Sequence, residues 1–312
     1  MHPLDETLTE TDLNKTKYKN LGYLLMSYEN AASLVNTEWV AEHLNDPNAR
    51  MLDCSYHLAA TGRDANTEYN NAHIPGALHF DIDKVCDLSP TPSPHMFPSA
   101  EGFAAIVGGM GIANDTQVIV YDADGLFSAP RVWWMFRVFG HKDVAVMTGG
   151  FRNWQAEGRP VSAEVPVFAP KPFKAQMDHS KIRSIQEIMA NLDTGERLIL
   201  DARAVNRFTG ESPEPRTEVK PGRIPGSSNL PYTEIIDAEP GTFRDADSLR
   251  KAFDSVGADG SREVTTTCGS GITACILGLG MHLIGRDNWT LYDGSWTEWG
   301  SNPNTPKEKG IV

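Results

Sequence analysis

Cysteine is scarce in this chain, and its spacing excludes several kinds of protein. Only 4 cysteines occur among 312 residues, and no pair has the two-residue separation of a zinc or thioredoxin-type motif. So few thiols cannot hold a chain of this length together with disulfides. We therefore expect free thiols in a reducing compartment, the cytoplasm or alternatively the mitochondrion, and we expect neither a metal nor a cofactor.

Basic residues and long apolar runs are also lacking. Lys and Arg total 28 against 41 Asp and Glu, a formal net charge of −13, whereas nucleic acids and anionic membranes call for a basic face. No apolar run reaches the roughly 18 residues of a membrane-spanning helix. We expect neither nucleic acid nor a membrane as a partner. Residues 1–26 contain acidic residues and only a short apolar run, which predicts a disordered tail rather than a targeting signal.

The same pattern of short segments occurs twice in the chain. Asp53 recurs as Asp201, 148 positions later, and Trp154 recurs as Trp299, 145 positions later. The matched segments keep one order: 51–53 with 199–201, 73–76 with 223–226, 118–122 with 264–268, and 147–154 with 291–299. Repetition at a nearly constant offset indicates an internal duplication. We predict a first copy at 27–157, a proline-rich linker at 158–181 and a second copy at 182–312.

Each copy alternates apolar strands with helices, which predicts an α/β fold with a parallel sheet flanked by helices. Strands are expected at 50–54, 117–121, 144–147, 197–201 and 264–267. Helices are expected at 38–44, 100–108, 128–139, 184–191 and 272–284. In such sheets, sites form beyond the carboxyl ends of the strands.

One glycine-rich loop lies at such a strand end. Cys268 follows a β-branched strand and is followed by Gly269 and Gly271, after which a helix begins. Backbone amides at a helix N-terminus stabilise an anion, which suits a nucleophilic or sulfur-carrying cysteine. The equivalent position of the first copy is Asp122, so the first copy is expected to be inert and the second to be catalytic.

The sequence context argues against two other functions of glycine-rich loops, phosphatase activity and nucleotide binding. A cysteine phosphatase needs an arginine six residues after its cysteine to clamp phosphate, and Ala274 stands there. The glycine-rich stretch 107–112 precedes a strand instead of opening a helix, so it lacks the context of a nucleotide-binding loop.

These motifs together resemble the two-domain rhodanese family over residues 29–301. The resemblance rests on segments 73–77, 128–136, 207–208, 214–216, 268–274 and 292–299. It implies a tandem of rhodanese-like domains and a sulfurtransferase that carries sulfur as a persulfide on its cysteine. Gly269-Ser270 stands where thiosulfate-using members carry basic residues, so the chain resembles the branch that takes sulfur from 3-mercaptopyruvate and releases pyruvate.

The resemblance also implies the roles of individual residues. Cys268 is expected as the nucleophile, and the amides of Gly269, Ser270, Gly271, Ile272 and Thr273 are expected to cradle the persulfide. Arg207 and Arg216 are expected to bind the substrate carboxylate. Ser270, His73 and Asp64 are expected as a proton relay, although His73 recurs as Arg223 in a turn that has a structural role.

Three questions stay open at this stage. The sulfur acceptor is a thiol, such as thioredoxin or a small thiol, or cyanide. The chain is alternatively a thiosulfate:cyanide sulfurtransferase or a non-enzymatic persulfide carrier. Cys275 and four tryptophans, Trp133, Trp134, Trp296 and Trp299, are expected to pack in the core rather than to bind a ligand.

Overall fold

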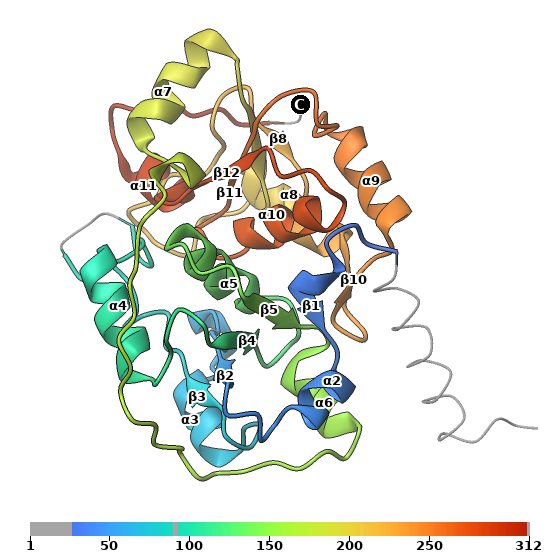
Figure 1. The fold of residues 1–312 in the computed structure, drawn as a ribbon. Coiled ribbons are helices and arrows are strands. Elements are labelled where there is room, and N and C mark those ends of the chain that lie inside the picture. The colour runs from blue at the N-terminus through green and yellow to red at the C-terminus, as the bar shows by residue number, and fades with distance from the viewer. Residues whose placement is uncertain (1–26, 90–92, 311–312) are drawn as a thin grey trace, which may run out of the picture.

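The computed structural model describes residues 27–89 and 93–310 (Figure 1). The predicted disordered tail, residues 1–26, lies outside the described residues. The chain forms two similar units, one above the other in Figure 1, each with a five-stranded sheet flanked by helices. Within these ranges, no helix combines the length and the apolar character needed to cross a membrane.

The first copy has the strand order β1-β5-β4-β2-β3, and all its neighbouring strands are parallel. Its strands are β1 (Leu34–Val35), β2 (Ala49–Asp53), β3 (Leu78–His79), β4 (Gln117–Tyr121) and β5 (Val144–Met147). Its helices are α2 (Thr37–Glu42), α3 (Ala65–Asn71), α4 (Ala100–Gly109), α5 (Ala129–Val138) and α6 (Gly150–Ala156). Helices cover both faces of the sheet, so every residue of β2 and β5 is buried.

The second copy repeats this arrangement with the strand order β6-β12-β11-β7-β8, again all parallel. Its strands are β6 (Ile182–Arg183), β7 (Leu198–Asp201), β8 (Ser228–Asn229), β11 (Val264–Thr267) and β12 (Trp289–Tyr292). Its helices are α7 (Ile185–Thr194), α8 (Val205–Phe208), α9 (Ala246–Ser255), α10 (Ala274–Leu283) and α11 (Ser295–Ser301). Each strand holds the place of its counterpart in the first copy, which confirms the internal duplication. A small antiparallel hairpin, β9 (Ile236–Asp237) with β10 (Thr242–Phe243), is added.

The predicted elements agree closely with the observed ones where the local signal is strong. The strands predicted at 117–121, 144–147 and 264–267 are β4, β5 and β11, residue for residue. Asn36 caps α2 by accepting a hydrogen bond from the Trp39 amide at 2.8 Å. The helix predicted from residue 272 begins at Ala274, because Gly271 adopts a left-handed φ of +80°. Helices α3 and α9 are absent from the prediction: α3 is short and rich in polar residues, and in α9 charged and polar residues separate the buried Ala246, Leu249 and Phe253.

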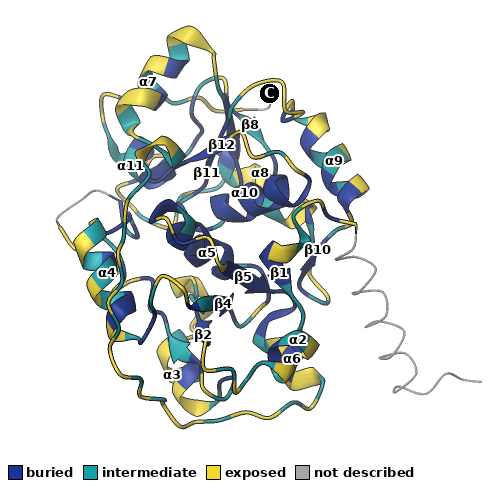
Figure 2. Cartoon of the chain, in the orientation of Figure 1, coloured by how far each residue is buried: buried dark blue, intermediate teal, exposed yellow. Residues whose placement is uncertain are grey.

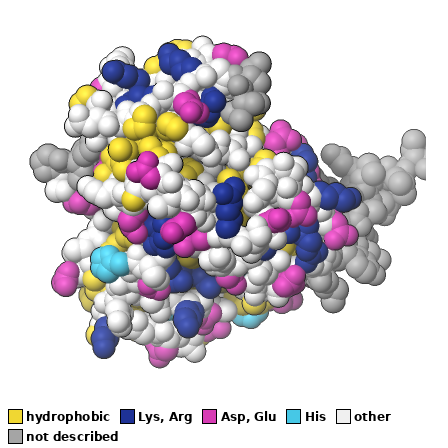
Figure 3. Space-filling model, turned by 90° about the horizontal axis from the view of Figure 1, so that it is seen from above, with side chains coloured by type: hydrophobic (Ala, Val, Ile, Leu, Met, Phe, Trp, Pro, Cys, Tyr) yellow, Lys and Arg dark blue, Asp and Glu magenta, His cyan; other side chains and the backbone are white. Residues whose placement is uncertain are grey.

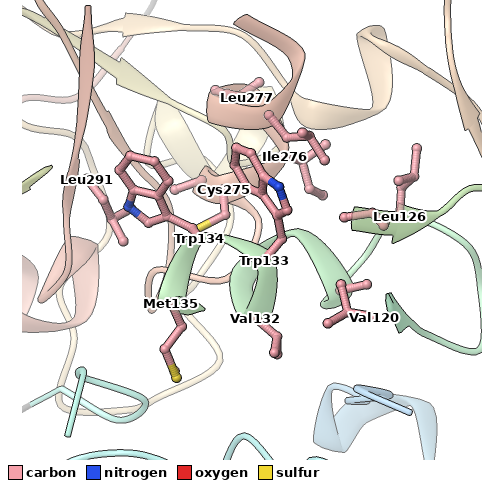
Figure 4. Close-up of a cluster of buried hydrophobic side chains, with 14 of the residues drawn as sticks. Val120, Leu126, Val132, Trp133, Trp134, Met135, Cys275, Ile276, Leu277 and Leu291 are labelled. Carbon is pink, nitrogen blue, oxygen red and sulfur yellow. The ribbon is translucent and has the colours of Figure 1, made fainter. Parts of the chain in front are cut away.

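The two copies share one hydrophobic core, built where α5 packs against α10 (Figure 2). Trp133 and Trp134 extend from α5 toward Cys275 and its neighbours on α10 (Figure 4). Trp134 also stacks on Trp289 of β12, with ring centroids 3.9 Å apart. The tryptophans Trp133, Trp134, Trp296 and Trp299 are all buried, as predicted. The apolar surface that α5 and α10 bury against each other stabilises one relative position of the two copies.

The linker follows the surface of the first copy in an extended path along one side of Figure 1. Its main chain donates hydrogen bonds to first-copy carbonyls: Lys171 to Gly108 at 2.9 Å, Gln176 to Phe139 at 3.1 Å and Asp178 to Val138 at 2.8 Å. A short 3-10 turn, His179–Lys181, then leads into β6. The linker is therefore bonded to the fold along its length.

Candidate active site

The loop between β11 and α10 carries Cys268 as its first residue. The Cys268 side chain is buried, with 2% of the residue exposed. The amide N–H groups of residues 269–273 donate to no acceptor in the part of the chain that the structure describes. Amides at the start of a helix have no partner within the helix, so a run of free amides beside a cysteine suits an anion.

The equivalent loop of the first copy shows what such a site holds. Asp122 follows β4 where Cys268 follows β11, and its carboxylate accepts hydrogen bonds from backbone amides at 2.6–3.1 Å. The donors are the amides of Asp124, Gly125, Phe127, Ser128 and Ala129. In the first copy the loop therefore binds a side chain of the protein, and the equivalent loop of the second copy offers its amides to an anion that the chain itself does not supply.

Cys268 opens into a pocket of about 220 Å³ at the boundary between the two copies. The pocket is lined by the Cys268 loop, by Arg203 and Arg207, and by aromatic residues of both copies: Tyr56, Phe127 and Tyr232. A pocket of this size suits a small molecule of a few non-hydrogen atoms, and its apolar walls keep bulk water from the thiol.

The two arginines of the pocket are held by one buried carboxylate. Glu214 lies 2.9 Å from Nη1 of Arg203 and 2.5 Å from Nη2 of Arg207. Arg203 also pairs with Asp201 at 2.7 Å. Burial alone would lower the pKa of Arg203, but these carboxylates raise it. Arg203 is thus fully paired, whereas Arg207 pairs with Glu214 through Nη2 and keeps 27% of its side chain exposed.

Arg216 lies beside a neighbouring cavity rather than in the lining of the Cys268 pocket. That cavity, of about 360 Å³, is also lined by Asp83, Cys86 and His95. Nη1 of Arg216 is 3.5 Å from Oγ1 of Thr297, which donates to the Gly269 carbonyl at 2.6 Å. Arg216 is therefore connected to the catalytic loop through one side chain.

A chain of polar groups reaches Ser270 from the first copy. The Ser270 Oγ lies 3.1 Å from Nδ1 of His95, and Nε2 of His95 lies 2.8 Å from Oδ1 of Asp83. The hydrogen bond from His95 is the main reason that the pKa of Asp83 lies below its ordinary value. An ionised Asp83 can only accept, so Nε2 carries a hydrogen and Nδ1 is left to exchange a proton with Ser270.

This geometry corrects the relay predicted from the sequence. His73 is fully buried, and its Nδ1 and Nε2 lie 2.7 Å and 3.1 Å from the carbonyls of Tyr69 and Glu164. Asp64 caps α3 by accepting from the Thr67 amide at 2.7 Å. Neither contacts the Cys268 loop, and His95 and Asp83 occupy the positions assigned to them. The turn at His73 is structural, as its recurrence indicates: His73 and Arg223 form equivalent backbone bridges with Ser162 and Glu308.

The remaining cysteines have other surroundings. Cys275 is fully buried under α5, and burial raises the pKa of its thiol to about 12, so it is a core residue as expected. Cys54 is buried in the first copy, and burial likewise raises the pKa of its thiol. Over residues 27–89 and 93–310, no three His, Cys, Asp or Glu side chains are grouped so that they could hold a metal ion.

Comparison with known proteins agrees with this architecture. The family model of the rhodanese-like domain matches residues 36–157 and 184–302, one match in each copy. The chain therefore belongs to the rhodanese family, as a tandem of two rhodanese-like domains.

The most similar relatives include users of both sulfur donors. The chain is 44% identical over 273 residues to 3-mercaptopyruvate sulfurtransferase of Rattus norvegicus, a match that covers 86% of the chain and 91% of the relative. It is 42% identical over 274 residues to thiosulfate sulfurtransferase of Bos taurus, with the same coverage. The crystal structure of SseA, a 3-mercaptopyruvate sulfotransferase of Escherichia coli, superposes with a TM-score of 0.77 at 34% identity and covers 85% of this chain and 98% of SseA. The sequence identities to the two kinds of sulfurtransferase are nearly equal, so they do not indicate which sulfur donor this chain uses. The geometry of the site is the better guide to the donor.

Proposed function

We propose that this chain is a sulfurtransferase that takes sulfur from 3-mercaptopyruvate, holds it as a persulfide on Cys268 and passes it to a thiol or to cyanide. The observation that carries the choice of donor is the contact of 3.1 Å between Ser270 and His95. Pyruvate leaves as an enolate that must take up a proton, whereas the sulfite that leaves from thiosulfate needs none. A proton relay that ends in the wall of the Cys268 pocket therefore supports 3-mercaptopyruvate.

In the proposed reaction the Cys268 thiolate attacks the sulfur of 3-mercaptopyruvate. The S–S bond forms as the bond between sulfur and C3 breaks, and the electron pair leaves with C3 as the pyruvate enolate. Ser270 delivers its hydroxyl proton to the enolate and takes one from Nδ1 of His95, which enters this step as an imidazolium with Nε2 held by Asp83; solvent then returns a proton to His95. The free amides of residues 269–273 stabilise the negative charge of the persulfide. An acceptor thiolate then attacks the outer sulfur and releases the Cys268 thiolate.

The substrate carboxylate is assigned to Arg207, with Arg216 as a second cation near the same loop. Arg207 lies in the pocket wall, and a Cβ placed on Gly269 would lie 3.2 Å from its Nη2, a close approach that glycine leaves open. A planar and permanently charged guanidinium suits a carboxylate, and 27% of the Arg207 side chain stays exposed.

The partners proposed for the second half-reaction are a small thiol or thioredoxin. A second pocket of about 370 Å³ shares Tyr56, Leu58, Phe127 and Tyr232 with the Cys268 pocket and leaves room for an acceptor. A nucleic-acid or membrane partner is not proposed, because the net charge is −13 and the face in Figure 3 intersperses acidic and basic side chains. Free thiols support a reducing compartment, the cytoplasm, with the mitochondrion as the alternative.

The donor is tested by steady-state kinetics on the wild-type protein. We expect kcat/KM for 3-mercaptopyruvate, followed as pyruvate release, to exceed kcat/KM for thiosulfate, followed as sulfite release, with one acceptor thiol used throughout. A higher value for thiosulfate would overturn the donor assignment in favour of thiosulfate:cyanide sulfurtransferase. Absence of turnover with both donors, together with a persulfide on Cys268, would favour a persulfide carrier.

Replacing Arg207 by Met should raise KM for 3-mercaptopyruvate about tenfold or more. A hydrogen bond to a charged group contributes about 1.5–3 kcal/mol, and each 1.4 kcal/mol or so is tenfold in binding. Arg250→Met is the matched control, because Arg250 also pairs with a carboxylate, Glu29 at 2.9 Å, and lines neither the Cys268 pocket nor the proposed acceptor pocket. Equal changes in KM for 3-mercaptopyruvate and thiosulfate would show that Arg207 does not recognise the carboxylate.

A further inference from the structure

A fully buried ion pair connects the two copies directly behind the active site. Nη1 of Arg131, on α5 of the first copy, lies 2.6 Å from Oδ1 of Asp293, which follows β12 in the second copy. The side chains are 0% and 6% exposed. A buried ion pair is often no more stabilising than apolar residues of the same volume. The stability of the fold therefore does not explain this pair, whereas its contacts with the active site do.

One side of the pair holds the segment that carries His95. Nη2 of Arg131 donates to the His95 carbonyl, and Oδ2 of Asp293 accepts from the Phe97 amide at 2.8 Å. The Arg131 guanidinium also lies over the Phe97 ring, 3.9 Å from its centroid. His95 has a φ of +66°, a left-handed conformation that is unfavourable for a residue with a side chain. The contacts on either side of His95 keep the backbone in that conformation.

The other side of the pair holds the Cys268 loop. Nη1 of Arg131 donates to the Gly271 carbonyl at 3.4 Å. A Cβ added to Gly271 would lie 3.0 Å from the Asp293 carbonyl oxygen and 3.1 Å from Nη1 of Arg131, so the loop fits against the pair without space for a methyl group. Arg131 thus contacts Gly271, which follows Ser270, and also the backbone of His95, whose Nδ1 faces the Ser270 hydroxyl.

We propose that Arg131 and Asp293 are positioning residues that hold the His95 imidazole at proton-transfer distance from Ser270. The proposal rests on the proposed function, since it assigns the pair a role in delivering the proton to the pyruvate enolate. Proton transfer requires a heavy-atom distance of about 2.6–3.2 Å, and a misplacement of about 1 Å costs about 10²-fold in rate. Neither residue of the pair lines the Cys268 pocket. Arg131 also contacts the core thiol of Cys275, so the pair reaches the site through His95, Phe97 and the Cys268 loop.

The test compares turnover of 3-mercaptopyruvate with turnover of thiosulfate in two variants. Arg131→Lys keeps the charge of the side chain, and Asp293→Asn keeps its shape. We expect kcat for 3-mercaptopyruvate to fall about 10²-fold, and kcat for thiosulfate, whose leaving group takes no proton, to fall much less, through the contact with the Cys268 loop alone. Both activities are measured on one preparation, so the ratio does not depend on the fraction of folded protein. Equal losses with the two donors would mean that the pair is merely structural and would overturn the proposal.

Two further variants separate this proposal from the proposed function. Arg131→Lys combined with His95→Gln should be no slower with 3-mercaptopyruvate than His95→Gln alone, because both changes interrupt one relay; additive losses would contradict the positioning role. If His95→Gln alone leaves 3-mercaptopyruvate turnover unchanged, the relay itself fails, and the positioning role fails with it. Ser33→Ala is the control for an inter-copy contact far from the site: it removes a 3.0 Å contact with Nε2 of His282 and should leave the ratio unchanged.

Discussion

Cys268→Ser should reduce sulfur transfer from 3-mercaptopyruvate and from thiosulfate by more than about 10³-fold, because loss of a covalent nucleophile removes the whole two-step route. The serine hydroxyl is similar in size and fits beside the same amides, but it cannot form a stable bond to the transferred sulfur. The measurement is pyruvate and sulfite release, together with the intact mass after donor treatment, which should increase by one sulfur atom only in the wild type.

Cys54→Ser is the control for this experiment, since Cys54 is a buried thiol of the first copy and lies outside the pocket. It should retain both activities and the persulfide mass. Sulfur transfer by Cys268→Ser, or a persulfide located on another cysteine, would contradict the assignment of the nucleophile.

His95→Gln should lower kcat for 3-mercaptopyruvate by about 10²- to 10⁴-fold, the range in which positioned acids and bases contribute. The Gln side chain can still hydrogen-bond Ser270 or Asp83, but it cannot release a proton. Turnover of thiosulfate should remain near the wild-type value, because sulfite leaves without protonation. Pyruvate and sulfite release over a range of pH measure the two effects separately.

His73→Gln is the matched control for the loss of an imidazole. Both ring nitrogens of His73 face backbone carbonyls, and a Gln amide can donate to a carbonyl in the same way. We expect its effects on the two donors to be equal. A selective loss of 3-mercaptopyruvate turnover in His73→Gln, with His95→Gln unaffected, would restore the relay predicted from the sequence.

The fold could be predicted from local patterns that occur twice. Apolar strands such as 117–121 and 264–267 are read from a few adjacent residues, and their recurrence at one offset identifies the duplication. The Cys268 loop could be predicted for the same reason, since its cysteine, glycines and helix are contiguous. Helix α3 could not, because Tyr69 is its one buried residue and no apolar stripe marks it. Helix α9 does carry a buried stripe of Ala246, Leu249 and Phe253, so the sequence held a signal for it.

The relay could not be predicted, because it depends on contacts between residues far apart in the sequence. Ser270 and His95 are separated by 175 positions, and His95 lies in a proline-rich loop without a regular period. One signal was available: the segment between β3 and α4 contains His95, whereas the equivalent segment between β8 and α9 contains no histidine. His73 lies in a repeated turn, and repetition indicates a structural role, whereas the histidine proposed for the relay is not part of a repeated motif.

The carboxylate of Asp122 has a consequence for how much sulfur one chain can carry. The amides around it are permanently occupied, because a ligand tethered to the same chain has an effective concentration that no free anion in a cell matches. Among the described residues, the amides around Asp122 are bonded to its carboxylate, whereas those of residues 269–273 have no acceptor. We therefore expect one equivalent of transferable sulfur per chain, and we expect sulfate or phosphate to compete with the donor at Cys268 and not at Asp122.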